Sequence, residues 1–238
     1  MLIAATSDLD YLGVNLEPFW EALKKVIQPD LFLFAGDMYE YRNPDQYGTI
    51  LDFIKLRNWK CPIVAIFGNR EFPEDEDDIK KVCGKKITFL NDESIVLKIK
   101  NKTVGIVGSR GSLDMPTWWQ SHHVKGVKDM YQQKIEKAEK LLKELDTDIK
   151  ILLTHYATTY KTLKGEDPDI YPGLGSQKYE KVIEQTKPTF VIHGHVHFGI
   201  PLAFVNSIPV FNVSFHLNKK IVEIDTENLP KIGLKKYE

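Results

Sequence analysis

The sequence has few cysteines, no surplus of basic residues and no long apolar run. Its two cysteines, Cys61 and Cys83, form neither a metal-ligand spacing nor a disulfide framework, which favours reduced thiols in a cytoplasmic protein. Lysine and arginine (32) are balanced by aspartate and glutamate (33), so general nucleic-acid binding is not expected. No apolar stretch approaches the length of a membrane span, and we expect no membrane partner.

What is present is the composition of an ordinary globular protein. Hydrophobic residues make up 42% of the 238 residues and charged residues 27%. We find no internal repeat and no low-complexity linker, so we expect a single domain over residues 1–238. The first six residues are apolar but lack a basic leader and a cleavage-site pattern, which indicates a first strand.

The first part of the chain alternates almost wholly apolar strands with helices. We expect strands at 2–6, 31–35 and 62–67 and helices after Pro18 and over 46–56. The helix after Pro18 should bury the residues that recur at helical spacing, namely Phe19, Trp20, Leu23, Val26 and Ile27. Apolar strands separated by helices are typical of a parallel sheet covered on both faces. In such sheets, ligands bind beyond the carboxyl ends of the strands.

The second part predicts shorter strands, a long helix and two irregular segments. The expected strands cover 87–90, 94–99, 103–107, 149–153, 202–205, 209–213 and 221–224, and the expected helices 127–145 and 177–186. Residues 115–123 form an aromatic segment without a clear period, which we interpret as a loop. Its Trp118 and Trp119 either line a substrate site or pack on the next helix. Residues 164–176 indicate an exposed loop.

Ionisable and amide side chains follow several of the predicted strands. The apolar run Phe190–Ile192 leads into a histidine cluster, and other strands end in aspartate, asparagine or histidine. The candidate metal ligands are Asp8, Asp10, Asp37, Asn69, His155, His195 and His197. This set exceeds the four positions of one tetrahedral ion. It fits two divalent ions that share a carboxylate, an arrangement that clamps a phosphoryl group and activates water.

The order of these motifs resembles the calcineurin-like metallophosphoesterase family. The motifs are Asp8-Leu9-Asp10, Gly36-Asp37, Gly68-Asn69, Thr154-His155 and Gly194-His195-Val196-His197. The resemblance implies an α/β fold, a four-layer α/β/β/α sandwich in which two packed mixed sheets are flanked by helices. It also implies a dinuclear centre that hydrolyses phosphate mono- or diesters by a hydroxide bridging the two metals.

The resemblance also assigns the ligands to two ions. Asp8, Asp10, Asp37 and His197 would surround one metal, Asp37 would bridge, and Asn69, His155 and His195 would complete the second site. His195 and Arg70 are the catalytic candidates, and Arg70, Trp118 and Trp119 the candidates for substrate binding. His193 is expected to pack or hydrogen-bond behind the ligands, and Tyr156 to pack. His122, His123 and His216 either line the substrate side or lie on the surface.

Two residues depart from the family pattern. Asp10 stands where the family usually has histidine, and the extra oxygen ligand favours Mn²⁺, with iron, zinc and nickel as alternatives. Arg70 stands where a second histidine is usual. Arginine cannot serve as a general acid near neutral pH, but it can hold phosphate oxygens. The following Glu71 is either an acid or a solvated neighbour, and we favour the solvated neighbour.

The sequence thus predicts a cytoplasmic metal-dependent phosphoesterase that acts on a small phosphate ester. Two alternatives stay open at this point. In the first, the fold is kept, catalysis is impaired at Asp10 and Arg70, and the protein is a protein-binding scaffold. In the second, it is a nuclease whose tryptophans stack on bases. Homo-oligomerisation is also left open.

Overall fold

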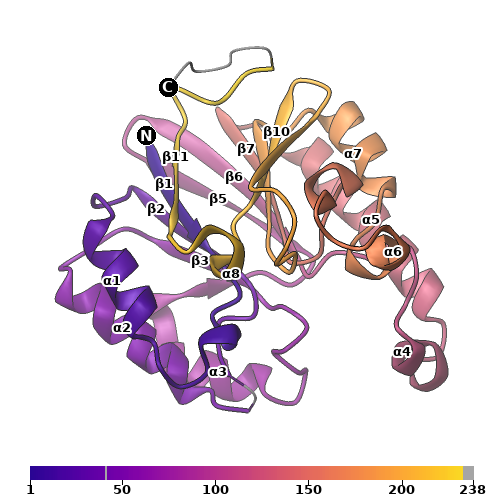
Figure 1. The fold of residues 1–238 in the computed structure, drawn as a ribbon. Coiled ribbons are helices and arrows are strands. Elements are labelled where there is room, and N and C mark those ends of the chain that lie inside the picture. The colour runs from indigo at the N-terminus through magenta and orange to yellow at the C-terminus, as the bar shows by residue number, and fades with distance from the viewer. Residues whose placement is uncertain (41, 233–238) are drawn as a thin grey trace.

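Two β-sheets pack face to face between two layers of helices in the computed structural model, which describes residues 1–40 and 42–232 (Figure 1). The five-stranded sheet has the order β11-β1-β2-β3-β4, and the six-stranded sheet the order β5-β6-β7-β8-β10-β9. The strands are β1 (Leu2–Thr6), β2 (Leu31–Ala35), β3 (Ile63–Ile66), β4 (Thr88–Phe89), β5 (Glu93–Ile99), β6 (Lys102–Ser109), β7 (Ile149–Thr154), β8 (Phe190–His193), β9 (Leu202–Val205), β10 (Ile208–Asn212) and β11 (Val222–Asp225).

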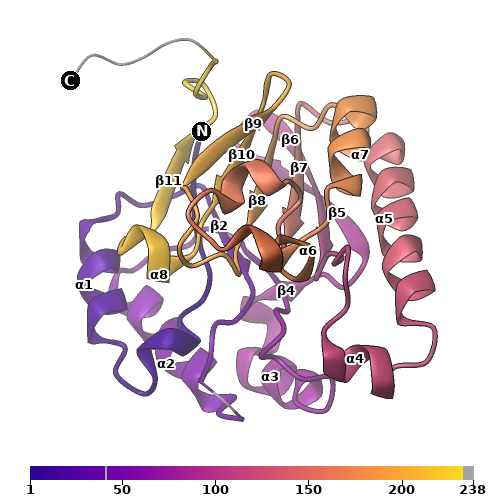
Figure 2. The same cartoon turned by 45° about the vertical axis from the view of Figure 1, so that its right-hand side comes forward.

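Helices cover the outer face of each sheet. α1, α2 and α3 lie on the five-stranded sheet, and α5 and α7 lie on the six-stranded sheet (Figures 1 and 2). The side chains of each group of helices form a buried cluster with the sheet beneath it. The helices are α1 (Glu17–Lys25), α2 (Asp45–Leu56), α3 (Glu76–Cys83), α4 (Trp118–His123), α5 (Val127–Glu144), α6 (Tyr171–Leu174), α7 (Lys178–Thr186) and α8 (Phe215–Asn218). The four-layer sandwich expected from the sequence is confirmed. The extent of a single domain stays a prediction, and residues 233–238 lie outside the described part.

The alternation of side chains along β2 explains how one apolar strand serves two cores. Leu31, Leu33 and Ala35 join the cluster between the two sheets, while Phe32 and Phe34 join the cluster under the helices. All five are fully buried. Successive side chains of a strand point to opposite faces, so a strand buried on both faces must be apolar at every position.

Parallel strands bring the carboxyl ends of both sheets to one edge of the molecule. β1, β2, β3 and β4 pair in parallel, as do β6, β7, β8 and β10, whereas β11, β5 and β9 are antiparallel. Just beyond β1 and β10, Ser7 pairs with Ser214, and the Phe215 N–H donates to the Ser7 carbonyl at 3.0 Å. The two sheets are therefore joined at the edge where parallel strands place their ligands.

The two segments interpreted as loops contain helices. Residues 118–123 form α4 because a capping box precedes it: Thr117 Oγ1 accepts from the Gln120 N–H at 3.2 Å, and Gln120 Oε1 accepts from the Thr117 N–H at 3.0 Å. Within 164–176 lie a 3₁₀ turn (Pro168–Ile170) and α6. Each has proline in its first turn, where the missing N–H costs little.

The structure bears on three smaller expectations. Ile27 is 71% exposed, because α1 ends at Lys25 and leaves it outside the helix. Cys61 and Cys83 are free, and burial raises the pKa of their thiols to about 11 and about 12. Among residues 1–40 and 42–232, no helix combines the length and apolarity needed to cross a membrane.

Candidate metal centre

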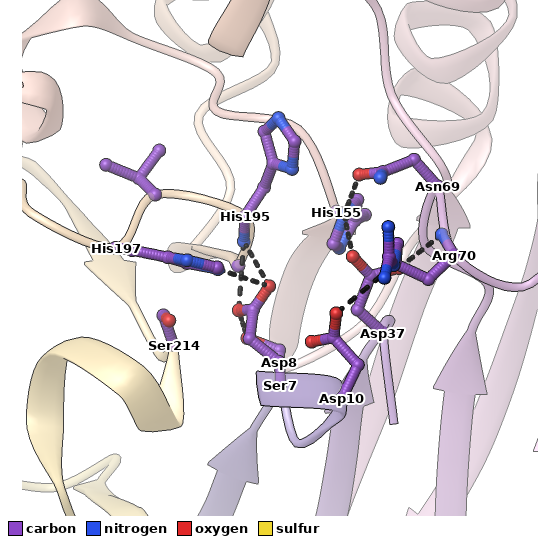
Figure 3. A network of polar contacts seen from close by, with 12 residues as sticks. Ser7, Asp8, Asp10, Asp37, Asn69, Arg70, His155, His195, His197 and Ser214 are labelled. Atoms are coloured by element: carbon purple, nitrogen blue, oxygen red, sulfur yellow. Dashed lines mark hydrogen bonds and ion pairs between the residues drawn. The ribbon is translucent and has the colours of Figure 1, made fainter. Parts of the chain in front are cut away.

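The seven predicted ligands gather at the shared edge of the two sheets (Figure 3). Asp8 and Asp10 follow β1, Asp37 follows β2, and Asn69 follows β3. The histidines come from the other sheet, since His155 follows β7 and the remaining two follow β8. Residues that are up to 189 positions apart in sequence thus lie around one space.

Two groups of these side chains are close enough to hold metal ions. In the first, ligand atoms of Asp8, Asp10 and Asp37 all lie within 4.8 Å of one another. In the second, the same holds for Asp37, His155 and His195. Asp37 belongs to both groups, so its carboxylate lies between two adjoining candidate cation sites.

His155 has the hydrogen bonding of a metal-ligating imidazole. Its Nδ1 lies 2.9 Å from the carbonyl oxygen of Ala35, which can only accept, so Nδ1 carries a hydrogen. Its Nε2 lies 2.8 Å from Asn69 Oδ1 and 3.3 Å from Asp37 Oδ2. Burial opposes protonation, but the Asp37 carboxylate outweighs it and raises the pKa of His155 to about 9. Nε2 and the two oxygens therefore converge on a position that favours a cation.

Asp8 is held as a buried, ionised carboxylate. The His195 N–H donates to its two oxygens at 3.1 and 3.0 Å, and His197 Nε2 lies 3.3 Å from Oδ1. Burial raises the pKa of Asp8, but the hydrogen bond with His197 and the nearby histidines outweigh it and lower that pKa to about 2. Asp8 therefore ties the loop after β1 to the loop after β8.

Asp10 lies among carboxylates that disfavour its own negative charge. Burial, together with the carboxylates of Asp37 and Asp8, raises the pKa of Asp10 to about 7. Its Oδ1 is buried and has no hydrogen-bond partner among the described residues, while its Oδ2 lies 3.3 Å from Arg70 Nε. Three converging carboxylates with an unpartnered oxygen fit a divalent ion of the hard, oxygen-preferring class.

Three of the ligand positions have a left-handed backbone. The φ angles of Asp8, Asp37 and His195 are 59°, 53° and 67°. A non-glycine residue in this region costs on the order of 1 kcal/mol or more and persists where its surroundings fix it. Here hydrogen bonds fix it: the Asp8 N–H donates to Gly36 O at 3.0 Å, and the Asp10 N–H to Asp37 O at 3.2 Å.

The metal-ligand groups open on a cavity of about 320 Å³. Its lining combines ligands, the arginine and three residues from elsewhere, namely Asp10, Asp37, Asn69, Arg70, Glu166, Leu174, His195, His197 and Phe198. Asp8 and His155 are fully buried behind this lining. Arg70 thus shares this cavity with Glu166, Leu174 and Phe198.

Glu71 is not the solvated neighbour that we expected. It is fully buried, and its carboxylate accepts hydrogen bonds from the N–H groups of Asp37 (2.7 Å), Met38 (2.7 Å) and Gly68 (2.6 Å) and from the Tyr47 hydroxyl (2.9 Å). From its position in the sequence, Glu71 looked like an exposed loop residue. The sequence could not show its burial, because most of the donors come from other segments of the chain. Glu71 therefore holds the loops that carry Asp37 and Asn69.

Glu166 is a further residue of the site that the sequence did not indicate. Its Oε1 accepts from the N–H groups of His197 (3.0 Å) and Phe198 (2.8 Å), and it lines the cavity. It lies in the segment that we interpreted as an exposed loop. Nothing in its local sequence distinguishes it from the neighbouring Asp167 and Asp169, since only the fold brings this loop against the loop after β8.

The two tryptophans lie on α4 and are not part of the cavity lining. Trp118 and Trp119 are 72% and 59% exposed. Their ring contacts are with His122 and His123 one turn further on, at centroid distances of 4.4 and 4.9 Å. The pair therefore does not pack into the body of the protein, and substrate binding by the two tryptophans stays a prediction.

The remaining candidates lie behind or beside the ligands. His193 is buried, with Nε2 at 2.9 Å from Thr162 Oγ1 and Nδ1 at 2.8 Å from Gly194 O, as expected for a residue behind the ligands. Tyr156 is buried and packs edge-on against His195, with ring centroids 4.9 Å apart. The ring centroids of His216 and His197 are 4.8 Å apart, so His216 borders the site.

Family comparison agrees with this geometry. The model of the calcineurin-like phosphoesterase family matches residues 1–199. This chain belongs to the calcineurin-like phosphoesterases. The resemblance seen in the ordered motifs is therefore confirmed, and the protein is a member of a family of metal-dependent hydrolases. No curated protein matches the chain.

Solved structures share the fold at low identity. A phosphopantetheinyl hydrolase from Mycobacterium tuberculosis is 16% identical, with a TM-score of 0.71 over 96% of this chain and 98% of that one. The protein TT1561 from Thermus thermophilus is 14% identical, with a TM-score of 0.57 over 94% and 98%. An NAD nucleotidase from Haemophilus influenzae is 13% identical, with a TM-score of 0.52 over 91% of this chain and 45% of that one. At these identities the likeness shows the fold alone.

Proposed function

We propose that this phosphoesterase binds two divalent ions and hydrolyses a small phosphate mono- or diester. The observation that carries the proposal is the position of Asp37, which belongs to both groups of candidate ligands. A carboxylate shared in this way is the arrangement of two-metal hydrolytic sites. We assign the protein to the cytoplasm because its two thiols are free.

Each ligand has a defined part in this proposal. Asp8, Asp10, Asp37 and His197 would hold one ion, and Asp37, Asn69, His155 and His195 the other. When bound, two such ions supply Lewis acidity and a nucleophile from water near neutral pH. The predominance of oxygen in the first set favours Mn²⁺ over Zn²⁺.

The cavity residues would bind and orient the ester. Arg70 lines the cavity and its guanidinium can donate to phosphate oxygens as negative charge develops. It cannot give a proton to the departing alkoxide. His195 lines the same cavity from the opposite sheet and belongs to the second ligand group, so we assign it a catalytic role at the phosphoryl group.

The second ligand set argues for an enzyme over a scaffold. A protein that only binds partners has no need of Asn69, His155 and His195. In this chain the three residues are present and close together: His155 Nε2 lies 2.8 Å from Asn69 Oδ1, and the ring centroids of His155 and His195 are 4.9 Å apart. We therefore favour an enzyme in which Asp10 and Arg70, in place of the usual histidines, alter the chemistry and the second ligand set is kept.

The test is a metal-dependent hydrolysis assay with p-nitrophenyl phosphate and bis(p-nitrophenyl) phosphate. We expect turnover with Mn²⁺, loss of turnover after chelation, and recovery when Mn²⁺ is returned. The variant Asp37→Ala should stay inactive at every Mn²⁺ concentration. A folded wild-type protein that contains two equivalents of metal and cleaves no mono-, di- or cyclic phosphoester would favour the scaffold.

A further inference from the structure

The two residues that depart from the family pattern are in contact with each other. Arg70 Nε lies 3.3 Å from Asp10 Oδ2, although the residues come from the loops after β3 and β1 (Figure 3). In the family pattern both places hold a histidine. The chain has therefore exchanged two imidazoles for a carboxylate and a guanidinium that form an ion pair beside the first candidate metal site.

The two oxygens of Asp10 have different surroundings. Oδ2 faces Arg70, whereas Oδ1 is buried and has no hydrogen-bond partner among residues 1–40 and 42–232. Asp10 also supplies one ligand atom to the group formed with Asp8 and Asp37. The same carboxylate is therefore within reach of an ion on one side and of a resident cationic side chain on the other.

Arg70 is anchored at its backbone, and its side chain, which pairs with Asp10, is partly exposed. Its N–H donates to Asp37 Oδ1 at 2.7 Å, which fixes the main chain next to the metal-ligand groups. Its side chain is 47% exposed and lines the cavity. A guanidinium in this setting can turn from Asp10 toward an anion in the cavity without a change of fold.

We propose that Arg70 competes with the metal ion of the Asp8–Asp10–Asp37 group, and that a phosphate group entering the cavity draws its guanidinium off Asp10. This rests on the proposed function of the site. The fixed positive charge of Arg70 next to the carboxylates repels a divalent ion and occupies Asp10 Oδ2. A phosphate offers the planar guanidinium two oxygens as a bidentate acceptor in place of Asp10.

A reciprocal coupling results from this competition. If phosphate removes Arg70 from Asp10, phosphate must strengthen metal binding, and metal must strengthen phosphate binding by the same factor. Direct contact between phosphate and metal contributes to the coupling in any such centre. The part that passes through Arg70 disappears when the guanidinium is removed, which separates the two contributions.

The experiment measures Mn²⁺ binding to the full chain by the EPR signal of free Mn²⁺, with and without inorganic phosphate. We expect Arg70→Met to tighten the weaker Mn²⁺ site by roughly tenfold without phosphate. Phosphate should tighten that site in the wild type, and this factor should fall by about threefold or more in Arg70→Met. The matched control is Lys100→Met, which removes a cation paired with Asp30 at 2.8 Å at the opposite end of the strands. Lys100→Met should change neither the Mn²⁺ affinity nor the factor by which phosphate tightens Mn²⁺ binding.

A double-mutant cycle isolates the pair. In an Asp10→Asn background, the Arg70→Met effect on Mn²⁺ binding should shrink, because only the charge repulsion between Arg70 and the ion remains. Thermal unfolding of each variant checks that the fold is kept. Weaker or unchanged Mn²⁺ binding in folded Arg70→Met, or an undiminished phosphate effect, overturns the competition. A wild type that binds no Mn²⁺ overturns the proposed function itself.

Discussion

The carboxylate of Glu71 accepts a hydrogen bond from the backbone N–H of Asp37 at 2.7 Å. The same oxygen accepts from the Gly68 N–H at 2.6 Å, and the other oxygen accepts from the Met38 N–H at 2.7 Å. Because Asp37 belongs to both candidate metal-ligand groups, one buried glutamate fixes the loop on which the centre depends. We therefore expect the candidate metal site and the stability of the fold to be linked at this residue.

Replacement of Glu71 by alanine should therefore affect folding as well as metal binding. It leaves three N–H groups and the Tyr47 hydroxyl buried without an acceptor. We expect a loss of about 3–5 kcal/mol in the free energy of unfolding, the range for breaking a buried charged network. Chemical denaturation measures the loss, and elemental analysis measures the bound metal.

The matched control for this change is Glu74→Ala. Glu74 is an exposed glutamate three positions further along the same loop. Its removal should change the free energy of unfolding by less than about 0.5 kcal/mol. Equal losses in the two variants would mean that the Glu71 hydrogen bonds do not stabilise the loops.

The shared position of Asp37 predicts unequal effects of two aspartate substitutions on metal content. Asp37→Ala removes a ligand from both groups, whereas Asp10→Ala removes one from the first group only. After Mn²⁺ loading and desalting, we expect Asp37→Ala to retain almost no metal and Asp10→Ala about one equivalent. Metal content is measured by inductively coupled plasma mass spectrometry. Full metal content in Asp37→Ala would show that this carboxylate does not bridge two ions.

Close approach of two loops makes Gly68 a sensitive position. A Cβ at this residue would lie 2.2 Å from Asp37 Oδ1 and 2.6 Å from Asp37 N. Gly68→Ala should displace the Asp37 carboxylate, cost roughly 1–3 kcal/mol of stability and abolish metal-dependent activity. In contrast, Gly48→Ala in α2 meets only Val82 Cγ1 at 3.5 Å and should stabilise the protein by about 0.5–1 kcal/mol. Activity retained in Gly68→Ala would contradict the packing argument.

The chemistry of Arg70 predicts a dependence on the leaving group. In the proposed function the guanidinium would stabilise charge on the transferring phosphoryl group but supply no proton, so esters of nitrophenol should react much faster than alkyl esters. Arg70→Ala should lower kcat/KM by roughly ten- to a hundredfold, the equivalent of one charge-assisted hydrogen bond. Arg70→His should flatten the plot of rate against leaving-group pKa. Rates over a series of substituted phenyl esters test this, and three identical slopes with no loss in Arg70→Ala would show that Arg70 points away from the substrate.

Glu166 predicts a charge preference among substrates. Its carboxylate lines the cavity while Oε1 accepts from the N–H groups of His197 and Phe198. Glu166→Gln keeps an acceptor oxygen and removes the negative charge, so KM for a doubly charged monoester should fall about threefold relative to a singly charged diester. Asp169→Asn, an exposed aspartate on the same segment, is the control and should leave the ratio unchanged. An unchanged ratio in Glu166→Gln would place its charge too far from the phosphate to matter.

The sequence predicted the strands and their terminal ligands because each depends on local pattern. An apolar run such as Leu31–Ala35 can only be buried on both faces, and parallel strands bring the residues after their carboxyl ends to one edge. The same local reasoning failed at residues 118–123. There a capping box of Thr117 and Gln120 starts a helix in a segment without hydrophobic periodicity.

What the sequence determined by itself was therefore the fold class, the family and the set of ligand candidates, since periodicity and ordered motifs are properties of the chain alone. Only the tertiary structure decided the contacts of Glu71, Glu166 and the Asp10–Arg70 pair. Glu71 bonds to Asp37 from 34 positions away, and Glu166 to His197 from 31 positions away. Whether a glutamate is solvated or buried depends on which backbone donors the fold brings to it. A contact between distant loops cannot be predicted from the residues next to it in the sequence.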